Sequence, residues 1–247
     1  MQKVLTPAER LIVGFDFKPD RAKGQNAQWV YDSVLRLADN LAGIGCIAKV
    51  NSALRLYGYD LIDVLHGRGL QVFADLKFYD IKETLATDGV ILRETKPEIV
   101  TVACCAGVAA MKALKAELPD SEVLGVSVLT GLDDGDTDTM FGCLVSDAVM
   151  RFAGLGADAM LGGFISAPTE VRALRLAFGE LFSYNTPAIR PSWAEVKGDG
   201  QNQKRVMTPA EAIKAGADRI VVARPIVQAA NPREAALRTI DEIALVA

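Results

Sequence analysis

Short apolar runs alternate with segments of helical periodicity along the whole chain, and this alternation constrains the fold more than any other feature. Eight runs are predicted to be strands, at 11–17, 46–51, 71–78, 99–105, 122–129, 157–164, 181–186 and 219–223. The runs lack the polar–apolar alternation of a half-exposed sheet, so we expect strands that are covered on both faces. Parallel strands joined by helices form βαβ units, and eight such units close into a (β/α)8 TIM barrel.

The segments between these runs carry residues that start or stop helices. Apolar spacing predicts helices at 27–41, 53–66, 83–95, 108–117, 144–154 and 168–178, with two more that open at Thr208 and Asn231. Thr208 and Glu211 have the spacing of a capping box, with Pro209 at the first helical position. Neither a change in composition nor a linker divides the chain, so we expect residues 1–247 to form a single TIM-barrel domain.

The composition limits the partners and the location of the protein. Half of the residues are hydrophobic, and a net charge of −4 with a pI of about 5.2 argues against binding to nucleic acid or to an anionic membrane surface. The N-terminus lacks the apolar core of a signal peptide, and no apolar stretch is long enough to span a bilayer, so we expect a cytoplasmic protein. The cysteines have no paired spacing and are expected to be buried and reduced, with Cys104 and Cys105 on one strand.

An acid and a base stand close together on the third apolar run. Residues i and i+2 of a strand point to the same side, so Asp75 and Lys77 are expected to share a face, and Asp80 follows just beyond the strand end. Charges at a buried strand end must be paired or used in function. The spacing alone leaves two interpretations open, a partly buried salt bridge and a catalytic group.

The barrel fold favours the catalytic interpretation. In TIM barrels the catalytic groups lie at the C-terminal ends of the strands. Asp16 and Lys49 stand at or near such ends on the first and second runs, beside the pair on the third. Four charges that converge on one mouth exceed the needs of a structural ion pair, so the sequence predicts an active site there.

A second group of charges follows the seventh and eighth runs, where TIM barrels commonly bind phosphate. Arg224 comes directly after the run 219–223. The connection 188–207 is far longer than usual and carries cations and an amide at Arg190, Lys197, Gln203, Lys204 and Arg205. These residues suit a lid over an anionic ligand, and a solvated charged loop is the alternative.

The residues 75–84 read Asp-Leu-Lys-Phe-Tyr-Asp-Ile-Lys-Glu-Thr, which resembles the D-x-K-x-x-D-I-x-x-T signature of the orotidine 5′-phosphate decarboxylase family. The similarity follows the family order over essentially the whole chain, through Asp16, Lys49 and the segments 65–69, 128–130, 189–191, 203–205, 208–209 and 221–226.

Several positions depart from the family pattern. Lys82 and Glu83 replace the usual Pro-Asn, the segment 103–105 lacks a His that is often found there, and Ala188 and Ala223 replace Gly. The added methyl at Ala223 matters only if the backbone there needs a positive φ, which Gly adopts far more readily than Ala.

The resemblance implies an enzyme that needs neither cofactor nor metal and decarboxylates orotidine 5′-monophosphate to uridine 5′-monophosphate (UMP) and CO₂, the last step of de novo UMP biosynthesis. It implies catalytic roles for Lys49, Asp75, Lys77 and Asp80. It implies contacts with this small nucleotide substrate from Asp16, Ile81, Thr84, Thr130, Arg190, Gln203, Ala223 and Arg224. It further implies a homodimer with shared active sites, in which Asp80, Ile81 and Thr84 enter the site of the partner subunit.

Two alternatives stay open from the sequence. Mg²⁺-dependent sugar-phosphate decarboxylases and hexulose-phosphate synthases of the same superfamily share the D-x-K-x-x-D run, although Ile-x-x-Thr does not usually follow their second Asp. The other alternative is a catalytically silent nucleotide-binding barrel, although such a protein would be expected to have lost at least one of Lys49, Asp75, Lys77 and Asp80, and this chain keeps all of them.

Overall fold

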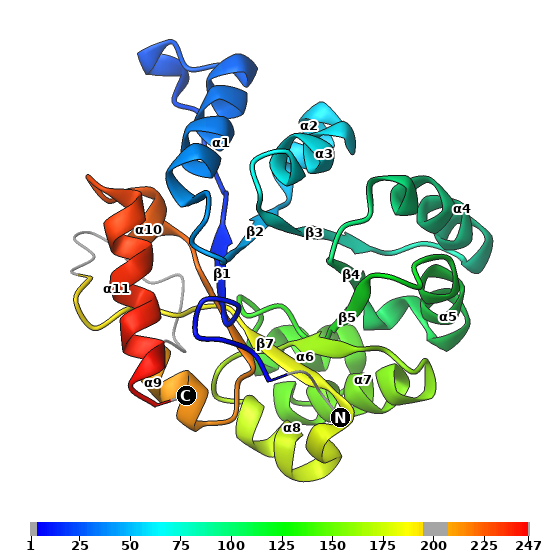
Figure 1. The fold of residues 1–247 in the computed structure, drawn as a ribbon. Coiled ribbons are helices and arrows are strands. Elements are labelled where there is room, and N and C mark those ends of the chain that lie inside the picture. The colour runs from blue at the N-terminus through cyan, green and yellow to red at the C-terminus, as the bar shows by residue number, and fades with distance from the viewer. Residues whose placement is uncertain (1–3, 195–206, 247) are drawn as a thin grey trace.

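The computed structural model of the protein describes residues 4–194 and 207–246. Eight parallel strands form a closed barrel in the order of the chain, and helices surround it (Figure 1). The strands are β1 (Leu11–Gly14), β2 (Ile47–Val50), β3 (Gln71–Phe78), β4 (Ile99–Ala103), β5 (Glu122–Val126), β6 (Gly163–Ile165), β7 (Ser183–Thr186) and β8 (Arg219–Val222). The TIM-barrel fold that the sequence predicts is thereby confirmed.

The helices follow the strands in turn and pack around the outside of the barrel. They are α1 (Ala27–Leu41), α2 (Ser52–Tyr57), α3 (Asp60–His66), α4 (Lys82–Leu92), α5 (Val108–Glu117), α6 (Asp134–Phe141), α7 (Val145–Asp158), α8 (Val171–Phe178), α9 (Pro209–Lys214), α10 (Arg224–Val227) and α11 (Pro232–Ala244). The predicted bounds of α1, α5 and β3 match the structure residue for residue.

The predicted helix starts near the C-terminus are confirmed. The Thr208 hydroxyl accepts from the backbone N–H of Glu211, whose carboxylate accepts from the Thr208 N–H in return, and Pro209 is the first residue of α9. At α11 the side chain of Asn231 accepts from the N–H of Glu234. Both caps satisfy N–H groups that have no partner within the helix.

Several predicted bounds were wrong, and the strands predicted at 11–17 and 122–129 end at Gly14 and Val126. The helix predicted at 53–66 is two helices, because Gly58 has φ 78° and ends α2. The strand predicted at 157–164 is mostly not a strand, because α7 continues to Asp158 and only β6 remains of the run. The strand predicted at 99–105 ends at Ala103, and Cys104 and Cys105 lie in a short 3₁₀ turn, where Cys105 is exposed rather than buried.

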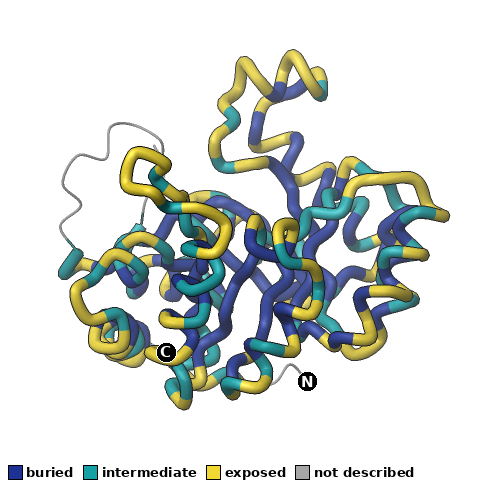
Figure 2. The backbone as a smooth tube through the Cα atoms, turned by 90° about the horizontal axis from the view of Figure 1, so that it is seen from above, coloured by how far each residue is buried: buried dark blue, intermediate teal, exposed yellow. Residues whose placement is uncertain are grey.

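The core has two layers that follow the two sides of the strands. Inside the barrel one cluster of buried apolar residues contains Ile12, Ile47, Phe73, Ile99, Leu124 and Val221. A larger cluster fills the space between the strands and the helices, and Figure 2 shows the buried strands enclosed by more exposed helices and loops. Side chains alternate along a strand, so residues two positions after the inner cluster also point into the barrel, at its C-terminal mouth.

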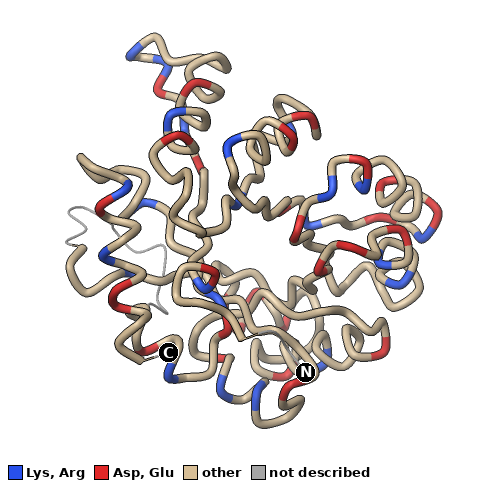
Figure 3. Tube along the Cα trace, in the orientation of Figure 1, with Lys and Arg blue, Asp and Glu red and all other residues tan. Residues whose placement is uncertain are grey.

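Charged residues of both signs are interspersed over the outer helices (Figure 3). In the ranges 4–194 and 207–246, no single helix is long and apolar enough to cross a membrane, and α6 and α7 reach that length and composition only as a pair bent by 51°.

Candidate active site

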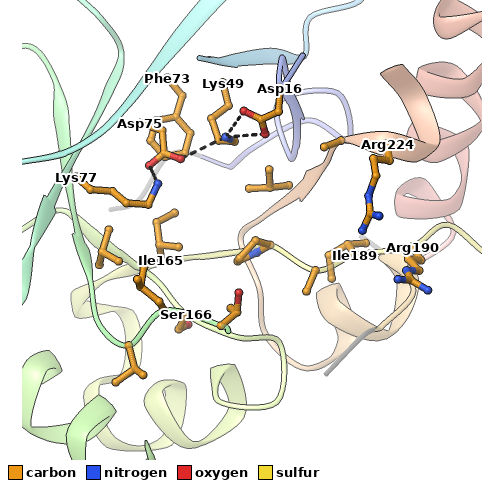
Figure 4. Close-up of a pocket in the computed structure, with 18 of the residues that line it drawn as sticks. Asp16, Lys49, Phe73, Asp75, Lys77, Ile165, Ser166, Ile189, Arg190 and Arg224 are labelled. Carbon is orange, nitrogen blue, oxygen red and sulfur yellow. Dashed lines mark hydrogen bonds and ion pairs between the residues drawn. The ribbon is translucent and has the colours of Figure 1, made fainter. Parts of the chain in front are cut away.

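A cavity of about 270 Å³ opens at the C-terminal mouth of the barrel. Its size is near the lower end of the roughly 300–1,000 Å³ typical of small-molecule pockets. Charged side chains lie on two sides of it, with Ile165 between them (Figure 4). Apolar residues that include Val126, Pro187 and Val221 also line the cavity. The pocket therefore offers separate places for charged and uncharged parts of one ligand.

Four charged side chains form a continuous network on one side of the pocket (Figure 4). Nζ of Lys49 lies 3.2 Å from Oδ2 of Asp16 and 3.2 Å from Oδ2 of Asp75. Nζ of Lys77 lies 2.7 Å from Oδ1 of Asp75. Lys49 and Asp75 lie two positions after the inward-facing residues Ile47 and Phe73, so strand alternation points both into the barrel. Asp16 follows the end of β1, and Lys77 lies in an irregular part of β3. The predictions that Asp75 and Lys77 share a face and that four charges meet at this mouth are confirmed.

Burial and mutual attraction act in opposite directions on the two central groups, which are 9% (Lys49) and 6% (Asp75) exposed. Burial lowers the pKa of Lys49, but the carboxylates of Asp75 and Asp16 outweigh it and hold this pKa above its ordinary value. Burial raises the pKa of Asp75, but Lys49, Lys77 and a hydrogen bond from Thr101 outweigh it and hold this pKa below its ordinary value. Both groups are therefore charged at neutral pH.

Gly14 makes room for this network. A Cβ on Gly14 would lie 3.0 Å from Oδ2 of Asp16, 3.0 Å from the Cβ of Ala223 and 3.4 Å from Cε of Lys49. The first two separations are shorter than most carbon contacts, so a larger residue would push apart the β1 and β8 ends. Ala223 itself has φ −116°, so the positive φ that would favour a Gly over an Ala is not needed there.

Two arginines, Arg190 and Arg224, lie on the other side of the pocket (Figure 4). The backbone N–H of Arg190 donates to the carbonyl of Met207 at 3.0 Å, next to an isolated β-bridge between Ile189 and Met207. These contacts hold the backbone at Arg190 in place. Ala188 has φ 64°, in the left-handed region that favours glycine. This conformation accounts for the Gly that the resemblance expects at this position.

The C-terminal helix α11 holds the residues that follow Arg190. The backbone N–H and the hydroxyl of Ser192 both donate to Oε2 of Glu242, at 3.1 and 3.2 Å. The guanidinium of Arg238 lies 4.7 Å from the ring centre of Trp193, within the range of a cation–π contact.

The structure brings eight of the twelve predicted site residues to the pocket, namely Asp16, Lys49, Asp75, Lys77, Thr130, Arg190, Ala223 and Arg224. Asp80, Ile81 and Thr84 do not line this pocket in the single chain. Oδ1 of Asp80 accepts from the N–H of Ile81 at 2.7 Å, and Ile81 is 66% exposed. Gln203, with Lys197, Lys204 and Arg205, lies outside the described residues.

Sequence reasoning missed one residue of the network, Thr101 on β4. Its side chain is fully buried, and its hydroxyl donates to Oδ1 of Asp75 at 3.0 Å. A signal was present, because Thr101 is a polar residue within an apolar run and has the same parity as the inward-facing Ile99. In the part of the chain that the structure describes, no three His, Cys, Asp or Glu side chains are grouped as a metal site would need.

Comparison with known proteins identifies relatives over nearly the full chain. Residues 9–239 match the family model described as orotidine 5′-phosphate decarboxylase / HUMPS family. The chain is 36% identical over 249 residues to the orotidine 5′-phosphate decarboxylase of Methylobacterium sp. (strain 4-46), covering 99% of each chain. It is 36% identical over 242 residues to the enzyme of that name from Synechococcus sp. (strain CC9605), covering 93% of each chain.

A solved structure supports the fold separately. The crystal structure of orotidine 5′-phosphate decarboxylase from Lactobacillus acidophilus superposes with a TM-score of 0.75 at 24% identity, covering 95% of this chain and 99% of that one. The family match and the relatives of similar length agree with the resemblance found in the sequence. The chain belongs to the orotidine 5′-phosphate decarboxylase / HUMPS family.

Proposed function

We propose that this protein removes CO₂ from C6 of orotidine 5′-monophosphate and releases UMP, and that it does so without a cofactor or a metal ion. The observation that carries this proposal is the network Asp16–Lys49–Asp75–Lys77 at the barrel mouth, with two arginines across the pocket. The substrate has a carboxylate at one end and a phosphate at the other, which matches these two charged sides.

The reaction needs stabilisation of a localised negative charge. When the C6–carboxylate bond breaks, its electron pair stays in an orbital in the plane of the ring, where the π system cannot delocalise it. Lys77 as an ammonium stabilises this pair and then transfers a proton from Nζ to C6, so that CO₂ leaves and UMP forms. Charges that are fixed in a site with little water act more strongly than in bulk solvent and need no reorganisation during the reaction.

Asp75 acts on the ground state in this proposal. Lys49 and Lys77 hold it as an anion, and it crowds the substrate carboxylate, so loss of CO₂ relieves a repulsion between two negative groups. Asp16 binds the ribose hydroxyls through its carboxylate, and Thr130 contacts the pyrimidine. Ala223 provides backbone contact with the substrate near Arg224.

The phosphate supplies binding energy away from the reacting bond. Arg224 and Arg190 lie on one side of the pocket and offer charge-assisted hydrogen bonds to a dianion. Gln203 is the third member of this group in our proposal. Binding energy from a distant group can be used to bury charges and orient the substrate at the reacting carbon, which raises kcat rather than lowering KM alone.

We also propose that the active enzyme is a homodimer. Asp80, Ile81 and Thr84 are displaced from their own pocket, and the neighbouring apolar side chains of Tyr79 and Ile81 are 67% and 66% exposed. Pairing with a second copy would cover these apolar groups and bring Asp80 into the partner's site beside its Lys77. One barrel domain per subunit and a cytoplasmic location complete the proposal, in keeping with the four free thiols.

The test is the loss of orotidine 5′-monophosphate absorbance after addition of purified protein in the presence of excess chelator. Turnover under these conditions supports the proposal. Turnover of a hexulose phosphate only when Mg²⁺ is added, with orotidine 5′-monophosphate unchanged, would instead assign the protein to the sugar-phosphate branch of the family. Binding of UMP without turnover of either substrate would indicate a silent nucleotide-binding barrel.

A further inference from the structure

The part of β3 that carries the active-site charges departs from a regular strand. Ala74 pairs with Val100 of β4 and Phe78 pairs with Val102, so the three β3 residues in between lie opposite Thr101 alone. Lys77, the last of the three, has φ 50°, in the left-handed region that a residue with a Cβ rarely adopts. Such a conformation persists only where the surroundings hold it.

In this irregular stretch, backbone groups of Leu76 and Lys77 form hydrogen bonds with side chains rather than with the backbone of a neighbouring strand. The N–H of Lys77 donates to Oγ1 of Thr101 at 2.9 Å. On the adjacent carbonyl, Nη2 of Arg55 donates to the oxygen of Leu76 at 3.3 Å. A buried N–H without a partner is destabilising, so the Thr101 hydroxyl replaces a backbone acceptor that the bulge has removed.

The same hydroxyl donates its one hydrogen bond to the carboxylate of Asp75. Oγ1 of Thr101 donates to Oδ1 of Asp75 at 3.0 Å, and this is the oxygen that lies 2.7 Å from Nζ of Lys77. Thr101 is fully buried and is not among the residues that line the pocket. It therefore touches both the backbone of Lys77 and the side chain of Asp75 from behind, without access to a ligand.

We propose that Thr101 is a positioning residue, whose hydroxyl fixes the left-handed backbone of Lys77 and the rotamer of Asp75 so that the ammonium and the carboxylate meet at the reacting carbon. This inference rests on the proposed function, since it assigns Thr101 a role in the same decarboxylation. The role needs a group that accepts one hydrogen bond and donates another at a fixed place. Among uncharged residues of this size, Thr and Ser meet that need and Val does not.

The experiment compares Thr101→Val, which keeps the shape and removes both hydrogen bonds, with Thr101→Ser, which keeps the hydroxyl. For each variant we would measure kcat and KM for orotidine 5′-monophosphate, the Kd of UMP, and the thermal unfolding midpoint. We expect Thr101→Val to lower kcat by roughly 10²-fold, because a small misplacement of catalytic groups has an effect of that size. Thr101→Ser should stay within about threefold of the wild-type kcat, and UMP, which lacks the reacting carboxylate, should bind both variants within about threefold of wild type.

Thr239→Val is the matched control for the loss of a buried hydroxyl. Thr239 is also fully buried, and its hydroxyl donates to the carbonyl of Ala235 within α11, away from the pocket. It should lower stability without changing kcat at temperatures where the protein is folded. If Thr101→Val does not fold, Thr101→Ala takes its place with the same expected loss of kcat.

Two results would overturn the inference. One is a kcat for the hydroxyl-free variant within about twofold of wild type, and the other is an equal loss of kcat in Thr101→Ser, which would assign the effect to the methyl group. These results differ from failure of the proposed function, in which the wild-type protein itself would not decarboxylate orotidine 5′-monophosphate.

Discussion

Nζ of Lys77 contacts Oδ1 of Asp75 at 2.7 Å, and the backbone at Lys77 is left-handed. Oδ2 of the same carboxylate lies 3.2 Å from Nζ of Lys49, so one buried anion lies between two cations. Removal of either cation would leave the buried carboxylate of Asp75 with a single cation partner, which is more destabilising than loss of a surface pair. The ion network is thus fixed before any substrate binds.

The pKa shifts of the network predict how stability depends on pH. The pKa of Asp75 is held below its ordinary 3.8, so its contribution to stability is fully present above that pH and is lost as the pH falls through the folded-state pKa. The pKa of Lys49 is held above its ordinary 10.5, so its contribution is fully present below that pH and is lost as the pH rises through the folded-state pKa.

The measurement is the difference in free energy of unfolding between wild type and Asp75→Asn, obtained by urea titration at several pH values. This difference should be constant at neutral pH and should shrink below about pH 4. The exposed Asp120→Asn is the control and should change stability by less than about 0.5 kcal/mol at neutral pH. A difference that grows as the pH falls would contradict the account, because it would mean that Asp75 is more easily protonated in the folded state.

Arg224→Ala should separate the two ends of the substrate. A charge-assisted contact with a phosphate dianion is worth roughly 2–5 kcal/mol, so kcat/KM for orotidine 5′-monophosphate should fall by a factor of tens to thousands. Activity on orotidine, which lacks the phosphate, should hardly change. The exposed Arg172→Ala on α8 should leave both activities as they are. Equal losses on both substrates would mean that Arg224 shapes the barrel rather than binds phosphate.

Ala188 offers a test of backbone strain beside the pocket. At φ 64° an Ala is less favourable than Gly by about 1–2 kcal/mol, which equals or exceeds the roughly 0.5–1 kcal/mol that the greater flexibility of Gly in the unfolded chain costs. Ala188→Gly should therefore leave the free energy of unfolding unchanged or raise it by up to about 1 kcal/mol. Ala113→Gly inside α5 should lower it by about 1 kcal/mol. Similar losses of unfolding free energy in both variants would mean that Ala188 is not strained.

The sequence predicted the barrel and the charge network for one shared reason. Parallel strands that are covered on both faces appear in the sequence as continuous apolar runs. Lys49 and Asp75 each follow an inward-facing residue, Ile47 or Phe73, by two positions, so they also face the inside of the barrel. Asp16, Lys49, Asp75 and Lys77 were therefore predictable from their positions on three strands.

Features that depend on a partner segment were not predictable in this way. The β3 bulge is defined by its register with β4, so neither the φ of Lys77 nor the role of Thr101 follows from one run alone. The helix α6 was missed because it opens with acidic residues and has few apolar ones. The sixth strand was misplaced because the buried end of α7 and β6 form one apolar run in the sequence.

The proposed shared site predicts recovery of activity in mixed dimers. Neither Lys77→Ala nor Asp80→Ala alone should turn over, but a mixture should approach about a quarter of wild-type activity, because half of the dimers are hybrids with one sound site of two. A mixture of Lys77→Ala with Lys49→Ala is the matched control. Both of these residues line the pocket of their own chain, so each hybrid site keeps one defect and no activity should return.

Subunit exchange must be verified for this test, for example by mass spectrometry of differently tagged chains. Verified Lys77→Ala/Asp80→Ala hybrids that stay inactive would mean that Asp80 acts within its own subunit. Recovery in the Lys77→Ala/Lys49→Ala control would equally contradict the assignment of these residues to one pocket.

The most direct measurement of the central claim is kcat for orotidine 5′-monophosphate in wild type and in Lys77→Ala, with CO₂ and UMP quantified as products and chelator present. We predict one UMP and one CO₂ per substrate consumed by wild type. Lys77→Ala should lose far more than the roughly 10²–10³-fold of a single electrostatic donor, because Lys77 both stabilises the carbanion and donates the proton, yet it should still bind UMP. The exposed Lys112→Ala on α5 should keep full activity. A Lys77→Ala protein that retains more than about a hundredth of the wild-type rate, or a wild-type protein that forms no UMP, would contradict the account.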